Sequence, residues 1–318
     1  MCARIMLLSV LVLLPMRVAA QDLDRRVPVK PGGLLQVDLD LGEEIRADRV
    51  SLEVRSHDAD EVWAVADLSG LGSSTVRFRL ESDDRVVRLY GRSGGIMSWL
   101  LGGPGVNVRV WVPREFSVDL RSSAGAIRIE DLRGEVRART EDGEIEVTSV
   151  EGNVRLRTTR GAVRVSEVEG DVEIVAEGDG SFEIRWITGH VEARTESGDI
   201  EARHLDGSAR LRTDGGEIAV RELRGELEAK TEGGAIYASF ASPPAGLLET
   251  RRGSVVIELP NGAGAELDAS VGEGRVELLD GLEVLGTRQV DRIKGTLDGG
   301  GAPLRVYSAR GIIRVGRR

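Results

Sequence analysis

Hydrophobic and polar residues alternate along the middle of the chain, in short segments that each follow a glycine. The segments GEIEV, GNVRLRT, GAVRV and GDVEI, between residues 143 and 174, show this most clearly. Alternation with a period of two is typical of a β-strand that buries one face. We therefore predict successive β-strands whose apolar side chains share one core. The predicted inward positions are Ile145, Val147, Val154, Leu156, Val163, Val165, Val172, Ile174, Ile200, Ile218, Val220 and Leu227, with the smaller Ala193, Ala202, Ala209 and Ala229.

The glycines between these segments recur every nine residues from Gly125 to Gly234, with one residue inserted in EGDGS at 177–181. Alternate turns differ, which makes the repeating unit two strands and about eighteen residues long. Glycine is needed where a turn demands positive φ or where neighbouring backbones approach closely. One kind of turn follows Thr140, Thr158, Thr195, Thr213 and Thr231, and the other is framed by Leu132, Val150, Val168, Leu205 and Leu223.

This periodicity predicts an all-β fold, a β-solenoid resembling a single-stranded β-helix. We expect about nine residues per strand and turn and two strands per coil. A repeat that cannot bury its face alone relies on its neighbours to complete the core. A β-propeller or a sandwich is the competing arrangement, but antiparallel hairpins rarely give one constant interval with two alternating turn types.

Three segments divide the chain. Residues 1–20 read as a signal peptide, residues 21–112 as an N-terminal β section that caps the solenoid, and residues 113–318 as the strand-repeat solenoid, continuous with the section before it. A last coil, residues 295–315, is expected to close the chain.

The proposed signal peptide has a cation at Arg4, an apolar run from Ile5 to Leu14 and the small-residue ending Val18-Ala19-Ala20. This layout predicts export and cleavage before Gln21. The run is too short to span a bilayer of about 30 Å, and we expect no transmembrane segment in the mature chain. The single cysteine, Cys2, lies inside the peptide, so the mature chain is expected to form no disulfide.

The charge balance argues against nucleic acid as a partner. The chain has 43 basic and 53 acidic side chains, and its net charge of −10 becomes −12 without the first twenty residues, which carry two arginines and no acid. An acidic surface repels phosphate backbones.

Several motifs together resemble a known family. They are a strand ending at Val112-Pro113, repeated T-x-x-G-x-I-x-V and G-x-V-x-x-x-T units, a second strand ending at Leu259-Pro260, and the ending GTLDGGGAPLRVYSARGIIRV. They are similar to the bacterial "putative adhesin" family of β-strand-repeat domains, over residues 27–315. The resemblance implies an exported or envelope-associated β-solenoid and carries over no catalytic residue.

The densest positive patch is formed by Arg137, Arg139, Arg155 and Arg157, on outward positions of adjacent coils. Guanidinium groups spaced by one coil suit a repeating polyanion such as an acidic glycan. The alternative is a solvated face, in which Glu141, Glu196, Asp214 and Glu232 neutralise the cations.

A second candidate surface is the glycine-flanked loop at 93–105. Its large apolar residues would contact a membrane or a partner protein if exposed, or cap the open end of the core if folded back. They are Ile96, Met97, Trp99, Leu100 and Leu101.

Signals for catalysis and for cofactors are weak. His57, His190 and His204 lack metal-ligand spacing, and the sequence has no nucleophile elbow or phosphate loop. Calcium-binding nonapeptide repeats need G-G-x-G-x-D turns, and Asp179 is the one position worth testing for calcium. Outward aromatic platforms for sugar rings are scarce in the central coils, with Tyr237 and Trp186 as exceptions. We expect no catalytic residues, no bound metal and no cofactor.

The sequence thus predicts an exported, non-catalytic binding or scaffold protein of the cell envelope or surface, adhesin-like, located in the periplasm, at the outer surface or outside the cell. The expected partner is an anionic cell-surface glycan or an envelope protein. The alternatives are a partner module of an envelope-stress system that docks through Trp99 and its neighbours, and a polysaccharide-active β-helix enzyme.

Overall fold

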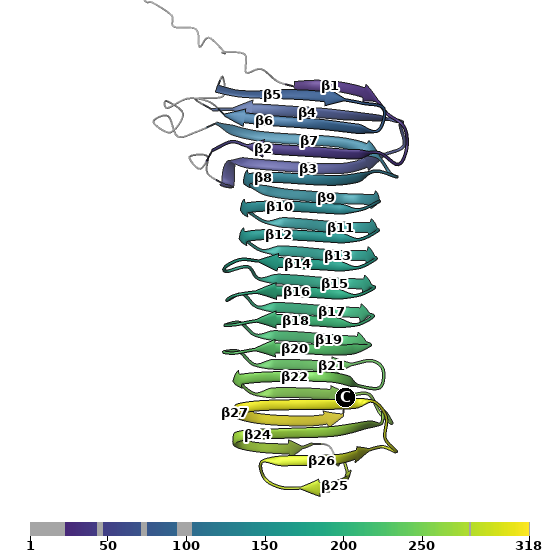
Figure 1. Cartoon of the computed structure of the whole chain (residues 1–318), viewed down its shortest axis with the longest axis vertical. Coiled ribbons are helices and arrows are strands. Elements are labelled where there is room, and N and C mark those ends of the chain that lie inside the picture. Colours follow the sequence, from purple (N-terminus) through teal and green to yellow (C-terminus); the bar gives the residue numbers. More distant parts are fainter. Residues whose placement is uncertain (1–22, 43–46, 71–74, 94–103, 280, 318) are drawn as a thin grey trace, which may run out of the picture.

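The computed structural model describes residues 23–42, 47–70, 75–93, 104–279 and 281–317. These residues form an elongated body of strands stacked along its long axis (Figure 1). The predicted all-β repeat fold is confirmed. The proposed signal peptide and the core of the apolar loop lie outside the described residues.

Twenty-seven strands and one short 3-10 turn make up the described chain. The first section contains β1 (Leu23–Pro28), β2 (Leu34–Asp40), η1 (Ala47–Arg49), β3 (Val50–His57), β4 (Glu61–Ser69), β5 (Val76–Ser82), β6 (Val86–Ser93) and β7 (Gly105–Pro113). The repeats contain β8 (Ser117–Ala124), β9 (Ala126–Arg133), β10 (Val136–Asp142), β11 (Ile145–Glu151), β12 (Val154–Arg160), β13 (Val163–Glu169), β14 (Val172–Ala176), β15 (Phe182–Thr188), β16 (Val191–Thr195), β17 (Ile200–Asp206), β18 (Ala209–Thr213), β19 (Ile218–Arg224), β20 (Glu226–Thr231), β21 (Ile236–Phe240), β22 (Ala245–Arg252) and β23 (Val255–Leu259). The last section contains β24 (Ala265–Leu278), β25 (Val284–Arg288), β26 (Arg292–Leu297) and β27 (Pro303–Arg317).

In the repeats, each strand from β10 to β21 pairs in parallel with the strands two places before and two places after it. Ile145, for example, lies between Ile127 and Val163, each eighteen residues away. Even-numbered strands from β8 to β22 form one broad face, and odd-numbered strands from β9 to β23 form the other. Every predicted inward position is buried between the two faces. The apolar residues that frame the second kind of turn, such as Leu132 and Val150, are buried as well.

The nine-residue spacing of the glycines follows from contact between neighbouring coils. At Gly161, φ is +134°, and a Cβ atom would lie 2.1 Å from the carbonyl oxygen of Gly143 in the preceding coil. Only glycine tolerates both the positive φ and this approach of two backbones. The glycine columns are therefore the sites where coils stack most closely.

The repeated threonines have a structural role that alternation alone does not predict, because they are buried. Thr213 Oγ1 donates a hydrogen bond to Gly198 O at 3.0 Å and accepts one from Gly216 N at 3.1 Å. Thr231 makes the same pair of bonds one coil later, to Gly216 O and from Gly234 N. These hydroxyl groups satisfy backbone groups of the glycine turn, which would otherwise be buried without a partner.

Both ends of the stack depart from the repeat. At the first end, β2 and β3 continue the two faces by parallel pairing with β8 and β9, while β1–β4, β4–β7 and β5–β6 pair antiparallel. At the other end, β27 pairs along its first half with β22, along its second half with β23, and on its far side with β24. The last coil in sequence therefore lies inside the stack, and the strands β24 to β26 lie beyond it.

Candidate functional site

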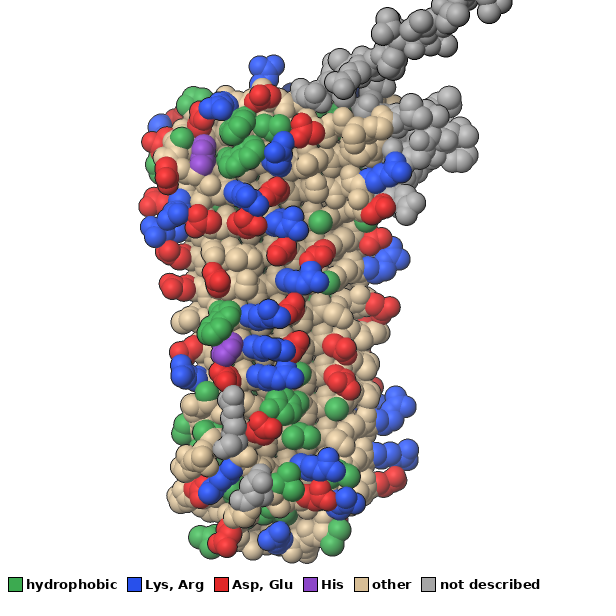
Figure 2. Space-filling view, turned by 180° about the vertical axis from the view of Figure 1, so that it is seen from behind, with side chains coloured by type: hydrophobic (Ala, Val, Ile, Leu, Met, Phe, Trp, Pro, Cys, Tyr) green, Lys and Arg blue, Asp and Glu red, His purple; other side chains and the backbone are tan. Residues whose placement is uncertain are grey.

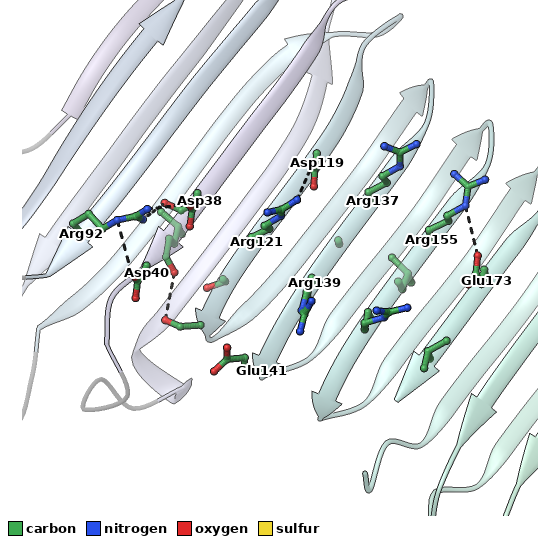
Figure 3. A pocket seen from close by; sticks show the side chains of 17 residues that line it. Asp38, Asp40, Arg92, Asp119, Arg121, Arg137, Arg139, Glu141, Arg155 and Glu173 are labelled. Atoms are coloured by element: carbon green, nitrogen blue, oxygen red, sulfur yellow. Dashed lines mark hydrogen bonds and ion pairs between the residues drawn. The ribbon is translucent and has the colours of Figure 1, made fainter. Parts of the chain in front are cut away.

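A large hollow lies on the broad face of even-numbered strands, where the first section meets the repeats. It has a volume of 570 Å³ and is lined by outward side chains of β2, β6, β8, β10, β12 and β14 (Figure 3). We call it the arginine groove. Its charged lining consists of Asp38, Asp40, Arg92, Asp119, Arg121, Arg137, Arg139, Glu141, Arg155, Arg157 and Glu173.

Strand register brings the four predicted arginines together in this groove. In the pairing of β10 with β12, Arg137 lies opposite Arg155 and Arg139 lies opposite Arg157. All four side chains are exposed, because they occupy the outward positions of their strands. The sequence also places Arg121 in the same column as Arg139. It gives no sign of Arg92, which arrives from the first section through the pairing of β6 with β2.

Arg137 and Arg155 form the inner row of cations in this groove, and both are paired with acids. Arg137 donates to Glu135 at 2.9 Å, and Arg155 contacts the same carboxylate and Glu173. In the neighbouring column, Arg121 lies 3.7 Å from Asp119, so it is paired as well. These pairs fit the alternative of a solvated, charge-balanced face for Arg121, Arg137 and Arg155.

Arg92, at the far side of the groove, is held by an acid of the first section. It donates to Asp38 at 2.9 Å, and this hydrogen bond raises the pKa of its guanidinium. Its charge is therefore partly compensated, as in the inner row.

Arg139 and Arg157, which we call the outer row, differ from the inner row in having no acidic partner among the described residues. Within the described residues, neither Arg139 nor Arg157 has an ion pair or a side-chain hydrogen bond, although both line the groove. Glu141, the acid expected to neutralise Arg139, lines the groove without an ion pair among those residues (Figure 3). Two unpaired guanidinium groups one coil apart, on a rigid sheet, can each give two parallel hydrogen bonds to a carboxylate, sulfate or phosphate.

Elsewhere on the same column of cations, the expected neutralisation occurs in part. Arg212 lies 3.8 Å from Asp214, and Glu232 accepts from Arg251 at 3.2 Å. The opposite broad face carries interspersed acids and bases (Figure 2). The described surface is thus mixed in sign.

The other candidates from the sequence are not brought into this groove. Ile96, Met97, Trp99, Leu100 and Leu101 lie outside the described residues, so both roles suggested for that loop remain predictions.

The histidines and Asp179 do not assemble a metal site in the described part of the chain. No three His, Cys, Asp or Glu side chains gather there as metal ligands. His190 Nδ1 contacts Ser208 Oγ, and His204 Nδ1 lies 2.8 Å from Glu222. The described part of the chain also includes no helix able to cross a bilayer.

Comparison with known proteins identifies the repeats. Residues 117–207 match the model of the Toastrack DUF4097 family. The family resemblance predicted from the sequence is thereby confirmed. No curated protein matches the chain.

Two of the solved structures that are similar to the chain are bacterial proteins. A putative cell adhesion protein from Clostridium sporogenes is 12% identical, with 94% of this chain and 100% of that chain covered and a TM-score of 0.24. A putative adhesin from Bacteroides fragilis is 11% identical, with 94% and 98% covered and a TM-score of 0.32.

Proposed function

We propose that this chain, with its Toastrack stretch at 117–207, is a β-solenoid of two strands per coil that serves as an exported, non-catalytic binding protein of the cell envelope or surface. Its ligand is an anionic surface polymer, bound in the arginine groove. One observation carries this proposal: Arg139 and Arg157 lie side by side on neighbouring coils, exposed and without an acidic partner among the described residues.

The groove suits a polymer better than a small molecule. It is open along the face and lies across several coils, and its cations repeat at the spacing of adjacent strands, about 4.8 Å. A chain bearing regularly spaced carboxylates or phosphates can meet successive arginines, whereas a single anion would use one or two. The neutralised inner row and Arg92 border the site and limit how far the positive field extends.

Co-sedimentation with purified cell-wall sacculi and outer-membrane vesicles tests the proposal. We expect the wild type to bind one of these materials and to release it as salt rises from 0.1 to 1 M, because screening shortens from about 10 Å to about 3 Å. The double variant Arg139→Gln, Arg157→Gln should lose this binding.

A matched control removes the same charge from the opposite face. Arg128 and Arg164 are exposed, but each is paired with an acid, Glu146 and Glu144 respectively. Arg128→Gln, Arg164→Gln should bind like the wild type. Equal loss of binding in both double variants would show that net charge, and not the groove, causes the binding. Absence of wild-type binding to both materials would refute the proposal.

A further inference from the structure

A second groove runs along the narrow edge where the odd-numbered strands β9 to β19 end. Six residues with left-handed backbone, one from each coil, form one wall of it. They are Asp131, Ser149, Glu167, Trp186, His204 and Glu222, with φ between 55° and 61°. Two hollows of 290 and 460 Å³ lie in this groove, floored by buried residues such as Val168 and Leu205, and Trp186 lines both. We call this the edge groove.

Trp186 is the unusual member of the column. Its side chain is 56% exposed, whereas the polar residues at the equivalent positions of other coils suit an exposed edge. A bulky residue with left-handed backbone is also an outlier in conformational terms. Neither core packing nor turn geometry accounts for an exposed indole here.

The indole is held in place on one side and open on the other. Its ring stacks on His204, with centroids 3.8 Å apart and an angle of 8° between the planes, and His204 in turn contacts Glu222. The register of β13 with β15 places Glu167 in the preceding coil, beside Trp186 on the side away from His204. The second ring face is therefore turned toward the smaller hollow.

This smaller hollow has an excess of negative charge. Its charged lining is Asp131, Glu151, Glu167 and Glu169 against the single cation Arg133. Asp131 is paired with Arg114, and Glu151 with Arg133. Glu167 accepts a hydrogen bond from the Ser149 hydroxyl at 2.7 Å, and the Glu169 side chain has no partner among the described residues.

We propose that the edge groove binds a lysine- or arginine-bearing segment of a protein partner. A cationic side chain would lie over the open face of Trp186 and pair with Glu167 and Glu169. The attraction of a cation to an indole face is strongest for tryptophan, and adjacent carboxylates add to it. Charge complementarity favours this partner over an anionic or neutral glycan. The two hollows follow one another along the stack, which favours an extended chain over a single small amine.

Binding of an acetylated hexalysine peptide, measured by fluorescence anisotropy at low salt, tests this site. We expect Trp186→Ala to weaken binding at least about fivefold, corresponding to the loss of one cation–π contact. Trp186→Phe should keep part of the affinity. Glu167→Gln, Glu169→Gln should weaken binding and flatten its salt dependence.

The matched control is Glu192→Gln, Glu196→Gln, which removes the same charge from exposed positions on the even-numbered face. It should bind hexalysine like the wild type. Equal affinity of Trp186→Ala and the wild type, or equal loss in both double variants, would overturn the proposal. Binding of chitohexaose or choline in place of hexalysine would also overturn it and identify a glycan or a small amine as the ligand.

Discussion

Single hydroxyl groups hold one column of turns together. Thr158, Thr213 and Thr250 are buried, and each donates a hydrogen bond to a backbone carbonyl of its turn or of the neighbouring coil. Thr140 occupies the same column and is also buried, but its Oγ1 has no hydrogen-bond partner among the described residues. The same residue type thus has two different energetic roles at equivalent positions.

This difference predicts opposite outcomes for one substitution. Thr213→Val leaves the shape intact but removes two hydrogen bonds from a buried turn, and it should lower the free energy of unfolding by about 1–3 kcal/mol. Thr140→Val removes an unpaired buried hydroxyl and should be neutral or stabilising. Chemical denaturation of both variants checks this, and equal losses would contradict it.

The glycine column predicts a second stability effect. Gly161→Ala should lower the free energy of unfolding by more than the ~1–3 kcal/mol expected from backbone strain alone. The reason is that its Cβ would also clash with Gly143 O. Gly262→Ala is the control, since Gly262 has φ of +73° but open space around its Cβ position. If thermal denaturation shows the same loss for both, close stacking of coils is not the reason for the column.

Between neighbouring strands, ion pairs link the outward faces of the coils. Glu201 on β17 accepts from Arg203 on its own strand and from Arg221 on β19 at 2.6 Å. The hydrogen bond from Arg203, with a smaller contribution from Arg221, lowers the pKa of Glu201 below its usual value near 4.5. The folded state therefore favours the charged carboxylate.

The pH dependence of stability follows from this shift. A lowered pKa in the folded state means that the stabilisation is present above pH 4.5 and is lost as pH falls through the lowered value. Glu201→Gln should reduce the Tm at pH 7 and have little effect at pH 3. The exposed Glu196→Gln serves as control. A Tm deficit of Glu201→Gln that is equal at both pH values would exclude the ion pairs as its cause.

The strands and their core were predictable because alternation is a local property. Ile145, Val147 and their equivalents are buried as expected. The edge groove was not predictable from alternation. Thr148 and Ser149 are two successive residues outside the core, and the left-handed Ser149 breaks the period of two before the buried Val150. Aligning Trp186 with Ser149 and Glu167 across the eighteen-residue unit is the signal that would have revealed it.

At the scale of the whole molecule, the stack behaves as a linear array in which each coil contacts its neighbours. Deleting residues 200–217 removes one full unit, because Ile200 pairs with Ile218. We expect this variant to fold with native-like circular dichroism and a modestly lower Tm. Deleting residues 200–208 would join two strands of the same face and should abolish cooperative unfolding. A folded nine-residue deletion would contradict the two-faced arrangement.

The arginine groove was predictable only in part, because some of its residues lie outside the periodic region. Arg137, Arg139, Arg155 and Arg157 belong to the periodic region, where register follows from counting residues. Arg92 and Asp38 come from the first section, whose pairings do not follow the repeat. Non-local pairing likewise placed β27 inside the stack, although its residues are the last in sequence.

The position of β27 constrains the order in which the molecule can be assembled. Strand β24 is synthesised before β27, yet β27 lies between it and the strands β22 and β23. During synthesis, residues 265–297 cannot pair with the rest of the stack until residues 303–317 have emerged. Such a long-range pairing is slow to form and leaves strand edges open meanwhile. Completion of this end is therefore a late kinetic event, when the growing chain is most vulnerable to pairing with another copy.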